Sequence, residues 1–440
     1  MSERIMEKEH LSKRVLIITY YWVPMGGSGV QRWVKFSKYL PENDWQPVIY
    51  TPSNPDFPLR DESFLADVPE SCEVIRQPIW EPYRIASLFS NKKNLNTGML
   101  RSGENTSCKD NFLNYVRSNY FIPDPRVFWV KKSINFLTTY LQENPVDVIV
   151  TNGPPHSMHL IGLGLKKKLG IKWVADFRDP WTNIDFYHSL KLTKSSDRKH
   201  RALEKEVVSS ADVVTVVGKS MQEEYLEYSD HVKVITNGYD QSISQKEIVR
   251  DTKFSMAHIG LMNADRNPKM LWKVLKKIGE EQPEFLKDLE IKLIGKVSAD
   301  VLNSIEENNL TSQLSLIDYV PHNEVHGLQQ SSQILLLVVN DTPNAKGILT
   351  GKIFEYLMAR RPILAVAPED GDLAEIINQT ESGEVFGFLE MKKLEAFVLK
   401  SYADFKNGSL EIQSHSIEKY SRHSLTKDMV ALFEGLRVSL

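Results

Sequence analysis

The feature that most constrains the fold is a regular alternation of short, β-rich apolar runs with longer amphipathic stretches. The apolar runs are four to seven residues long, which is the length of a buried strand. The stretches between them place apolar residues at helical spacing. Alternation of strand and helix is typical of parallel sheets, because each helix carries the chain back to the start of the next strand. We therefore predict an α/β fold with doubly wound sheets.

The predicted strands form two sets, separated by Asn237-Gly238, a dipeptide typical of turns. Each set is long enough for one domain of ordinary size. We predict Rossmann-like domains at residues 1–237 and 238–415, then a helical tail at 416–440, with packing of the tail on the first domain as a hypothesis. The predicted strands lie at 15–20, 146–151, 171–177, 213–217, 232–236, 257–260, 291–295, 314–319, 334–339 and 363–367, and the predicted helices include 31–40, 157–169, 203–209, 270–280 and 352–359.

Composition and charge exclude several classes. No run of about 18 apolar residues is present, so no membrane-spanning helix is expected. The first ten residues are charged and lack the apolar core of a signal peptide, which favours a cytoplasmic protein. Cys72 and Cys108 are the two cysteines, and no Cys/His cluster has zinc-ligand spacing, so neither a disulfide framework nor a metal is expected. The net charge of −3 disfavours a nucleic-acid partner.

Residues 84–132 interrupt the alternation. This segment holds nine basic and three acidic residues, a net charge of +6, with aromatic residues interleaved. Residues 91–109 are polar and lack periodicity, which predicts a mobile loop. One interpretation is a contact surface for an anionic membrane or a lipid-phosphate acceptor. The other is a solvated loop with helices that cover the core.

The motif at residues 347–365 is the most informative. It follows a buried strand, opens a helix and runs into the next strand. Thr350 suits an N-cap and Gly351 leaves its amide accessible, so the helix start favours a diphosphate. Lys352 adds a positive charge, and Glu355, one turn further on, offers a carboxylate for a ribose diol. The alternative is a capped amphipathic helix with a solvated Glu355.

A glycine-rich turn at Gly26 and Gly27 follows the first predicted strand and precedes a helix. Missing side chains let a ligand approach the backbone at a helix N-terminus. The spacing does not match the G-x-G-x-x-G pattern of dinucleotide-binding proteins, so a nicotinamide site is weakly supported. The motif alone fits a ligand loop and a plain turn equally well.

Three further loops follow strands and carry polar side chains. His156 follows residues 146–151, and Arg178 and Asp179 follow residues 171–177. Ligands of open α/β sheets bind beyond the carboxyl ends of the strands, so His156 suits a phosphate or hydroxyl contact, and Asp176 or Asp179 suits proton acceptance. The alternative is a structural Asp176–Arg178 pair. In the second domain, Arg266 is a candidate for the diphosphate, and the alternative is a solvated loop.

Taken together, GGSGVQRWVKFSKYL, GPPHS, ADFRDPW, VITNGYD and TGKIFEYLMARRPIL resemble the GT-B glycosyltransferases of the family 4 type, closest to bacterial members that build surface polysaccharides. The resemblance covers residues 13–383. It implies two domains facing across a cleft, a nucleotide sugar bound by the C-terminal domain, an acceptor bound by the N-terminal domain, retention of anomeric configuration and no catalytic metal.

The resemblance assigns roles residue by residue. Glu355 matches the second glutamate of the E-x7-E motif that holds the ribose, and Thr350 and Gly351 match the helix start that faces the diphosphate. Gly26 and Gly27 match the glycine loop near the donor, and Arg266 matches one member of the basic pair. Three positions depart from the pattern. Gly347 stands where the family has the first glutamate, and Leu261-Met262 stand where it has the other basic residue. Arg178 stands where many members have a histidine in the first domain.

We therefore predict a retaining glycosyltransferase that moves a sugar from a nucleotide-diphosphate-sugar donor to a hydroxyl of a glycan or lipid-linked glycan. The donor-binding candidates are Gly26, Gly27, Arg266, Thr350, Gly351, Lys352 and Glu355, and the catalytic candidates are His156, Arg178 and Asp179. No cofactor is expected. The protein is expected in the cytoplasm, with peripheral contact with the inner face of the plasma membrane as a hypothesis. The alternatives are a GT-B-fold sugar-nucleotide epimerase and a nucleotide-sugar-binding partner protein without activity, which Gly347 favours.

Overall fold

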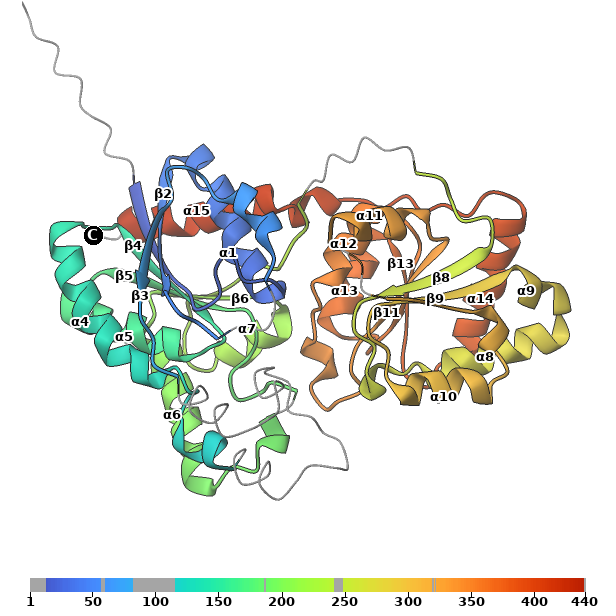
Figure 1. The fold of residues 1–440 in the computed structure, drawn as a ribbon, viewed down its shortest axis with the longest axis horizontal. Helices are drawn as coiled ribbons and strands as arrows, with labels where there is room; N and C mark the ends of the chain where they lie inside the picture. Colours follow the sequence, from blue (N-terminus) through green and yellow to red (C-terminus); the bar gives the residue numbers. More distant parts are fainter. Residues whose placement is uncertain are drawn as a thin grey trace, which may run out of the picture. The chain divides into compact units, whose positions relative to one another are not determined.

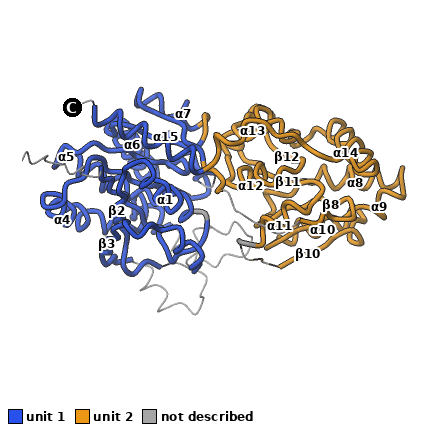
Figure 2. The backbone as a smooth tube through the Cα atoms, turned by 90° about the horizontal axis from the view of Figure 1, so that it is seen from above, with its two compact units in different colours: residues 1–217, 221–236, 422–440 blue, residues 218–220, 237–421 orange. Residues whose placement is uncertain are grey.

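The computed structural model describes residues 13–56, 60–81, 115–185, 187–240, 248–318, 320 and 322–438. The chain divides into two compact units, shown in different colours in Figure 2. Unit 1 comprises residues 1–217, 221–236 and 422–440, and unit 2 comprises residues 218–220 and 237–421. The chain therefore builds most of unit 1, then unit 2, and returns to unit 1 with its last 19 residues.

A parallel seven-stranded sheet forms the centre of unit 1 (Figure 1). Its order is β3-β2-β1-β4-β5-β6-β7, so the direction of winding reverses between β1 and β4. The central strands are buried because helices cover both faces. The strands are β1 (Lys13–Ile18), β2 (Trp45–Pro52), β3 (Glu73–Gln77), β4 (Val148–Gly153), β5 (Lys172–Phe177), β6 (Val213–Val216) and β7 (Val232–Val234).

Unit 2 repeats this plan with six parallel strands in the order β10-β9-β8-β11-β12-β13, and the reversal lies between β8 and β11. Such a reversal leaves a crevice at the carboxyl ends of the two strands, where open α/β sheets bind ligands. The strands are β8 (Phe254–Ile259), β9 (Leu289–Ile294), β10 (Leu314–Ile317), β11 (Ile334–Val338), β12 (Ile363–Val366) and β13 (Gly383–Phe386).

Helices connect the strands of both sheets (Figure 1). Those in the first part of the chain are α1 (Ser28–Tyr39), α4 (Val127–Glu143), α5 (Ser157–Leu169), α6 (Lys194–Ser210) and α7 (Lys219–Tyr225). The later ones are α8 (Lys269–Glu281), α9 (Pro283–Asp288), α10 (Ala299–Glu307), α11 (His322–Ser331), α12 (Lys352–Ala359), α13 (Asp372–Thr380), α14 (Met391–Lys406) and α15 (Arg422–Val438). Short 3-10 helices are η1 (Pro41–Asn43), η2 (Glu62–Asp67), η3 (Tyr187–Leu190), η4 (Ala264–Arg266), η5 (Thr311–Gln313), η6 (Ala345–Gly347) and η7 (Ile417–Tyr420).

The predicted fold class is confirmed: two parallel sheets alternate with helices, in the order of doubly wound folds. Three strands were missed. β2 carries two prolines, and the short strands β3 and β13 carry charged residues, so none reads as a continuous apolar run. The predicted helix at 203–209 is the C-terminal part of α6, whose N-terminal half is largely exposed and polar.

The tail predicted at 416–440 is divided between the units. η7 belongs to unit 2, and α15 belongs to unit 1, where it packs beside α1. Phe433 of α15 is fully buried, and its ring centroid lies 5.0 Å from that of Trp45 at the start of β2. Glu434 accepts hydrogen bonds from Trp45 Nε1 and Lys13 Nζ at 2.9 and 2.6 Å. The last helix therefore completes the core that the first strands begin.

Candidate functional site

A glycine in a left-handed conformation shapes the loop after β8. Gly260 has φ of +114°, which residues with side chains rarely adopt. Its amide donates to Ile294 O at 2.7 Å, which ties the loop to the end of β9. A Cβ on Gly260 would lie 2.8 Å from Lys352 Cε and 3.0 Å from Lys352 Nζ. The missing side chain therefore makes room for the Lys352 side chain against the backbone.

Helix α12 has the predicted bounds, but its N-cap is Gly351, so the assignment of Thr350 as N-cap is wrong. The Thr350 hydroxyl oxygen lies 3.4 Å from the amide nitrogen of Lys352, which is a long contact. Carbonyl groups of Thr350 and Gly351 instead accept the first bonds of the helix, from the amides of Ile353 and Phe354. Both predicted residues lie at the positive end of the helix dipole, which favours an anion.

Lys352 turns back from the start of α12 toward the end of β8. Its Nζ atom lies 3.2 Å from Nε2 of the fully buried His258. Burial lowers the pKa of Lys352 to about 7, and the nearby Arg266 adds to this effect, while Glu355 acts in the opposite direction. Sequence reasoning gave His258 and Gly260 no role, although a histidine and a glycine at a strand end were a signal of a crowded loop.

Arg266 lies in η4, in the same loop that carries Gly260. Its Nε donates to Asn340 Oδ1 at 2.7 Å, which holds the guanidinium group at the end of β11. Its Nη1 lies 3.4 Å from the carbonyl oxygen of Leu261. The same carbonyl oxygen lies 3.4 Å from His258 Nε2, which is 3.2 Å from Lys352 Nζ, so Arg266 is close enough to Lys352 to lower its pKa by repulsion. Such a pair of cations suits an anionic ligand of two or more charges.

Glu355 completes this group of charged residues in unit 2. It is the acidic residue in the first turn of α12 and is partly buried. Its Oε2 accepts a hydrogen bond from Gln329 Nε2 of α11 at 3.2 Å. The carboxylate therefore has a protein partner. This differs from the alternative of a solvated Glu355 that the sequence left open. The charges of Arg266 and Glu355 both act on Lys352, so the structure brings these three predicted residues together, and their role as a donor site stays a prediction.

In unit 1, the glycine-rich turn leads directly into α1. The helix begins at Ser28, three residues earlier than predicted, and Gly27 is its N-cap. Gly27 has φ of +95°, so this turn requires a glycine, although a Cβ here would meet nothing within 4 Å. Gly26 precedes it and is partly buried. The turn is therefore open at residue 27, as a ligand loop needs.

Arg178 lies against this turn. Its Nη1 is buried without a hydrogen-bond partner in the described structure, and a Cβ on Gly29 would lie 2.7 Å from it. Its Nη2 forms an ion pair with Asp179 Oδ2 at 3.1 Å. A buried guanidinium donor without a partner costs free energy unless a ligand supplies the acceptor. The two catalytic candidates from the loop after β5 therefore lie together, beside the start of α1.

His156 lies just before α5 and stacks on Trp181, with the ring centroids 4.7 Å apart and the planes 5° from parallel. Burial lowers the pKa of His156 well below its ordinary value, and His159, His200 and Arg178 reinforce this effect. The imidazole is therefore neutral at physiological pH. Its Nδ1 is buried and has no partner among the described atoms. A neutral ring suits a hydroxyl contact better than a phosphate contact.

Asp176 is not available as a base. Its fully buried carboxylate pairs with Arg32 of α1 and accepts further bonds from Trp33 and Thr215. Burial opposes ionisation, but Arg32 and these donors hold its pKa below the ordinary value. The suggested Asp176–Arg178 pair is therefore wrong, because Arg178 pairs with Asp179 instead.

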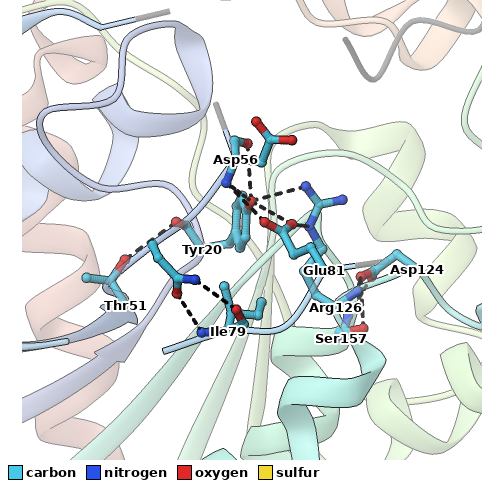
Figure 3. A network of polar contacts seen from close by, with 9 residues as sticks. Tyr20, Thr51, Asp56, Ile79, Glu81, Asp124, Arg126 and Ser157 are labelled. Atoms are coloured by element: carbon cyan, nitrogen blue, oxygen red, sulfur yellow. Dashed lines mark hydrogen bonds and ion pairs between the residues drawn. The ribbon is translucent and has the colours of Figure 1, made fainter. Parts of the chain in front are cut away.

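A polar network at the end of β1 was missed by sequence reasoning (Figure 3). Glu81 Oε1 lies 2.9 Å from Tyr20 Oη and 3.0 Å from Arg126 Nε, and only 1% of the Glu81 side chain is exposed. The amide of Asp56 donates to the other Glu81 oxygen at 3.0 Å. Arg126 also lies over the Tyr20 ring, at 4.5 Å. The network fixes the segment after β3 to the start of α4.

This network corrects one part of the predicted basic contact surface. Arg126 belongs to the segment 84–132, but its charge is neutralised inside unit 1 rather than offered to a membrane. Residues 84–114, with five of the nine basic residues, lie outside the described residues. In the described part, Tyr120 and Phe128 are 72% and 44% exposed. No helix of the described chain is long and apolar enough to cross a membrane.

Comparison with protein families adds an independent observation. The model of Glycosyltransferase Family 4 matches residues 27–242, which hold Gly27, His156, Arg178 and Asp179. A search of curated proteins finds no match. Many solved structures are similar to this chain at low sequence identity, which shows a shared fold.

Three of these structures show which kinds of enzyme share the fold. Sucrose-phosphate synthase from Thermosynechococcus elongatus is 13% identical with a TM-score of 0.61, over 97% of this chain and 100% of that chain. WaaG, a glycosyltransferase involved in lipopolysaccharide biosynthesis, is 13% identical with a TM-score of 0.56, over 96% of this chain and 100% of that chain. A putative UDP-N-acetylglucosamine 2-epimerase from Listeria monocytogenes is 10% identical with a TM-score of 0.53, over 97% of both chains. The fold is GT-B, which transferases and epimerases share.

Proposed function

We propose that this chain, whose residues 27–242 match the model of Glycosyltransferase Family 4, transfers a sugar, with retention of anomeric configuration, from a nucleotide-diphosphate-sugar donor to a hydroxyl of a glycan or lipid-linked glycan. The observation that carries the proposal is the group formed by Arg266, Lys352 and Glu355 in unit 2. The two cations suit the negative charges of a nucleoside diphosphate, and the carboxylate in the first turn of α12 suits the diol of its ribose.

In this proposal, unit 2 holds the donor. Arg266 and Lys352 bind the diphosphate oxygens together with the amides at Thr350 and Gly351, and Glu355 accepts hydrogen bonds from the ribose hydroxyls. The negative charge that develops on the leaving diphosphate is stabilised by groups that are already in place, which is the largest source of rate in many enzymes. The proposal assigns this role to protein groups and needs no metal or other cofactor.

Unit 1 is proposed to hold the acceptor. Arg178 has a buried donor without a partner and lies beside the turn of Gly26 and Gly27, which suits a ligand oxygen there. Neutral His156 is proposed to orient the acceptor hydroxyl. The leaving phosphate takes the acceptor proton on the same face of the sugar, and Asp179 keeps Arg178 in position. Retention follows from attack on the face that the leaving group vacates.

The acceptor is proposed to be part of cell-surface polysaccharide assembly at the cytoplasmic face of the plasma membrane. The similarity in fold to WaaG, an enzyme of lipopolysaccharide biosynthesis, supports this context. The exposed aromatic residues Trp80, Tyr120 and Phe128 support peripheral contact with a membrane that carries such an acceptor.

The test begins with calorimetric binding of UDP, GDP, dTDP and CMP to the wild type and to Glu355→Ala. We expect one nucleoside diphosphate to bind, and the variant to lose about 10- to 150-fold in affinity, since a charge-assisted hydrogen bond contributes roughly 1.5–3 kcal/mol. The matched control is Glu307→Ala, which removes an exposed glutamate from the end of α10. Binding of none of the four nucleotides to the wild type would contradict the proposal.

Activity separates the proposed transferase from its alternatives. A transferase releases nucleoside diphosphate from a nucleotide sugar and yields a glycosylated acceptor. A 2-epimerase instead converts UDP-N-acetylglucosamine to its epimer, and a binding partner without activity leaves the nucleotide sugar unchanged. Product analysis by mass spectrometry and NMR after incubation with glycolipid acceptors therefore distinguishes the three functions.

A further inference from the structure

The contacts of His258 determine which of its ring nitrogens carries the proton. His258 Nδ1 lies 3.1 Å from the carbonyl oxygen of Leu336, an acceptor only, so Nδ1 must carry the hydrogen. The neutral ring then has a lone pair on Nε2, which lies 3.2 Å from Lys352 Nζ. The carbonyl oxygen of Leu261, 3.4 Å from Nε2, lies equally far from Arg266 Nη1, which supplies a donor to it. His258 is therefore built to accept a hydrogen bond from Lys352.

This contact fixes the position of the Lys352 amine. The end of the side chain rests against Gly260, where any Cβ would collide with Cε and Nζ. Three titratable or charged groups face the amine: His258 from β8, Arg266 from η4 and Glu355 from α12 itself. Neutral His258 and cationic Arg266 offer no negative charge to the amine, and Glu355 only partly offsets the effect of burial. The site therefore favours the neutral amine until an anion binds.

We propose that His258 is a positioning residue for Lys352, and that binding of the donor diphosphate is coupled to the uptake of one proton. This inference rests on the proposed donor site. The proton comes from solvent and goes to Lys352 Nζ, which then donates to a phosphate oxygen while His258 keeps accepting from the same ammonium group. The new N–H bond forms as the bond between the proton and a solvent or buffer acid breaks, and no other covalent bond changes. The site is thereby sensitive to pH through one lysine.

The direction of the effect follows from the charges. The pKa of Lys352 is lowered to about 7 by burial and by Arg266, so part of the lysine population is neutral at physiological pH. Burial and Lys352 lower the pKa of His258 to about 3, so the histidine stays neutral throughout. A bound diphosphate favours the ammonium form and raises the pKa of Lys352. Affinity is therefore highest below pH 7 and falls as pH rises, by up to about tenfold for each pH unit.

The main experiment measures the affinity of UDP by calorimetry from pH 7 to pH 9, in two buffers with different enthalpies of ionisation. The terminal phosphate of UDP loses its last proton at about pH 6, so its charge is nearly constant in this range. For the wild type we expect a loss of at least about tenfold and uptake of a fraction of one proton near pH 7 that approaches one proton at higher pH. Lys352→Arg keeps the charge without a proton to lose, so its affinity should be independent of pH. The control Lys400→Met, at an exposed position of α14, should behave as the wild type.

The role of His258 is tested by His258→Phe and His258→Gln. Phenylalanine cannot accept from Lys352, so the amine leaves Gly260 for solvent, and the pH dependence of UDP affinity should move toward the pKa of free lysine, about 10.4. Glutamine keeps an acceptor within reach and should restore the wild-type profile. His415→Phe, at an exposed histidine, is the matched control. A wild-type pH profile in His258→Phe would overturn the role of His258, and thermal unfolding checks that the variant is folded.

A second measurement separates this inference from the donor proposal. The titration of Lys352 in the free protein, followed by NMR of ¹⁵N-labelled lysine and assigned with Lys352→Arg, needs no nucleotide. We expect a midpoint near 7 that rises when sulfate, an anion that does not titrate in this range, is added. This result supports the inference even if none of the nucleotides binds. A midpoint near 10, or UDP binding without proton uptake, overturns it even if the transferase proposal is correct.

Discussion

Arg32 of α1 and Asp176 of β5 form a buried, two-point ion pair. Arg32 Nε donates to Asp176 Oδ2 at 2.9 Å and Nη2 donates to Oδ1 at 2.8 Å, and neither side chain is exposed. The guanidinium also donates to the carbonyl oxygens of Ile235 and Thr236, both at 2.9 Å. One arginine therefore joins α1, β5 and the segment that leaves unit 1.

Removal of this arginine should be costly. Arg32→Met leaves Asp176 as a buried carboxylate without its cation, and breaking such a pair costs roughly 3–5 kcal/mol. We expect unit 1 to unfold at a clearly lower urea concentration. Arg201→Met is the control, because Arg201 forms an exposed pair with Asp197 within one helix, and such pairs contribute about 0.3–0.5 kcal/mol. Equal stability of the two variants would show that the network does not hold unit 1 together.

Acid should destabilise both units through their buried histidines, of which His159 and His258 are two examples. Burial lowers the pKa values of His159 in α5 and His258 in β8 to about 3, against an ordinary value of 6.5. Below pH 6.5 the unfolded chain binds protons that the native protein does not, so stability falls as pH decreases from 6.5 toward 3, by about 1.4 kcal/mol per histidine and pH unit at most.

Thermal unfolding between pH 7 and pH 5 checks this expectation. His159→Leu removes one of these buried histidines from unit 1 and should make the decrease in melting temperature shallower, whereas the exposed His423→Leu should not. A decrease as steep in His159→Leu as in the wild type would contradict the assignment for unit 1. Removal of His258 is a less clean test, because it also changes the position of Lys352.

Gly260 is predicted to be intolerant of any side chain. Gly260→Ala forces an alanine into a left-handed conformation and pushes Cβ to within 2.8 Å of Lys352 Cε. The displaced lysine should cost about tenfold or more in UDP affinity, the value of one charge-assisted contact. Gly408→Ala separates the two causes, since Gly408 has φ of +68° but open space around its Cβ position. Gly408→Ala should lower stability through strain alone and leave UDP affinity unchanged.

Arg178 is predicted to act in turnover rather than in nucleotide affinity. Arg178→Met removes the buried donor beside the glycine turn of unit 1, and loss of one charge-stabilising donor lowers kcat by roughly 10²- to 10³-fold. UDP affinity should change little, because the proposed nucleotide contacts lie in unit 2. Initial rates with saturating donor, and calorimetry with UDP, measure the two effects. Arg198→Met on the exposed face of α6 is the control, and an equal loss in both variants would contradict the role of Arg178.

The sequence predicts the fold well because buried parallel strands leave a strong local signal. β11, with the sequence ILLLV, is apolar at every position and was predicted. β2 was missed because two prolines interrupt its pattern. β3 and β13 are edge strands of their sheets, and edge strands carry charged residues that obscure the apolar run.

The candidate site was predictable only where it is local in sequence. Lys352 and Glu355 share one helix turn, and the motif that holds them gave both a role. Arg32, the partner of Asp176, is 144 positions away in the sequence, whereas Arg178 is only two positions away. No local pattern therefore indicates that Asp176 pairs with Arg32 and not with Arg178. The contact of His258 with Lys352 joins residues 94 positions apart and depends on the missing side chain of Gly260. Such relationships arise from the winding of the chain and become visible only in three dimensions.

The position of α15 in unit 1 has a consequence for biosynthesis. The ribosome makes β1 and α1 before residues 237–421 of unit 2, and α15 only after them. Until Leu425, Met429, Phe433 and Leu436 emerge, the apolar surface that they cover in unit 1 stays exposed to solvent and to other chains. Unit 2 is complete in the sequence by residue 421 and can fold during translation, whereas unit 1 closes only after α15 has been made. Unit 1 is therefore begun before unit 2 and completed after it.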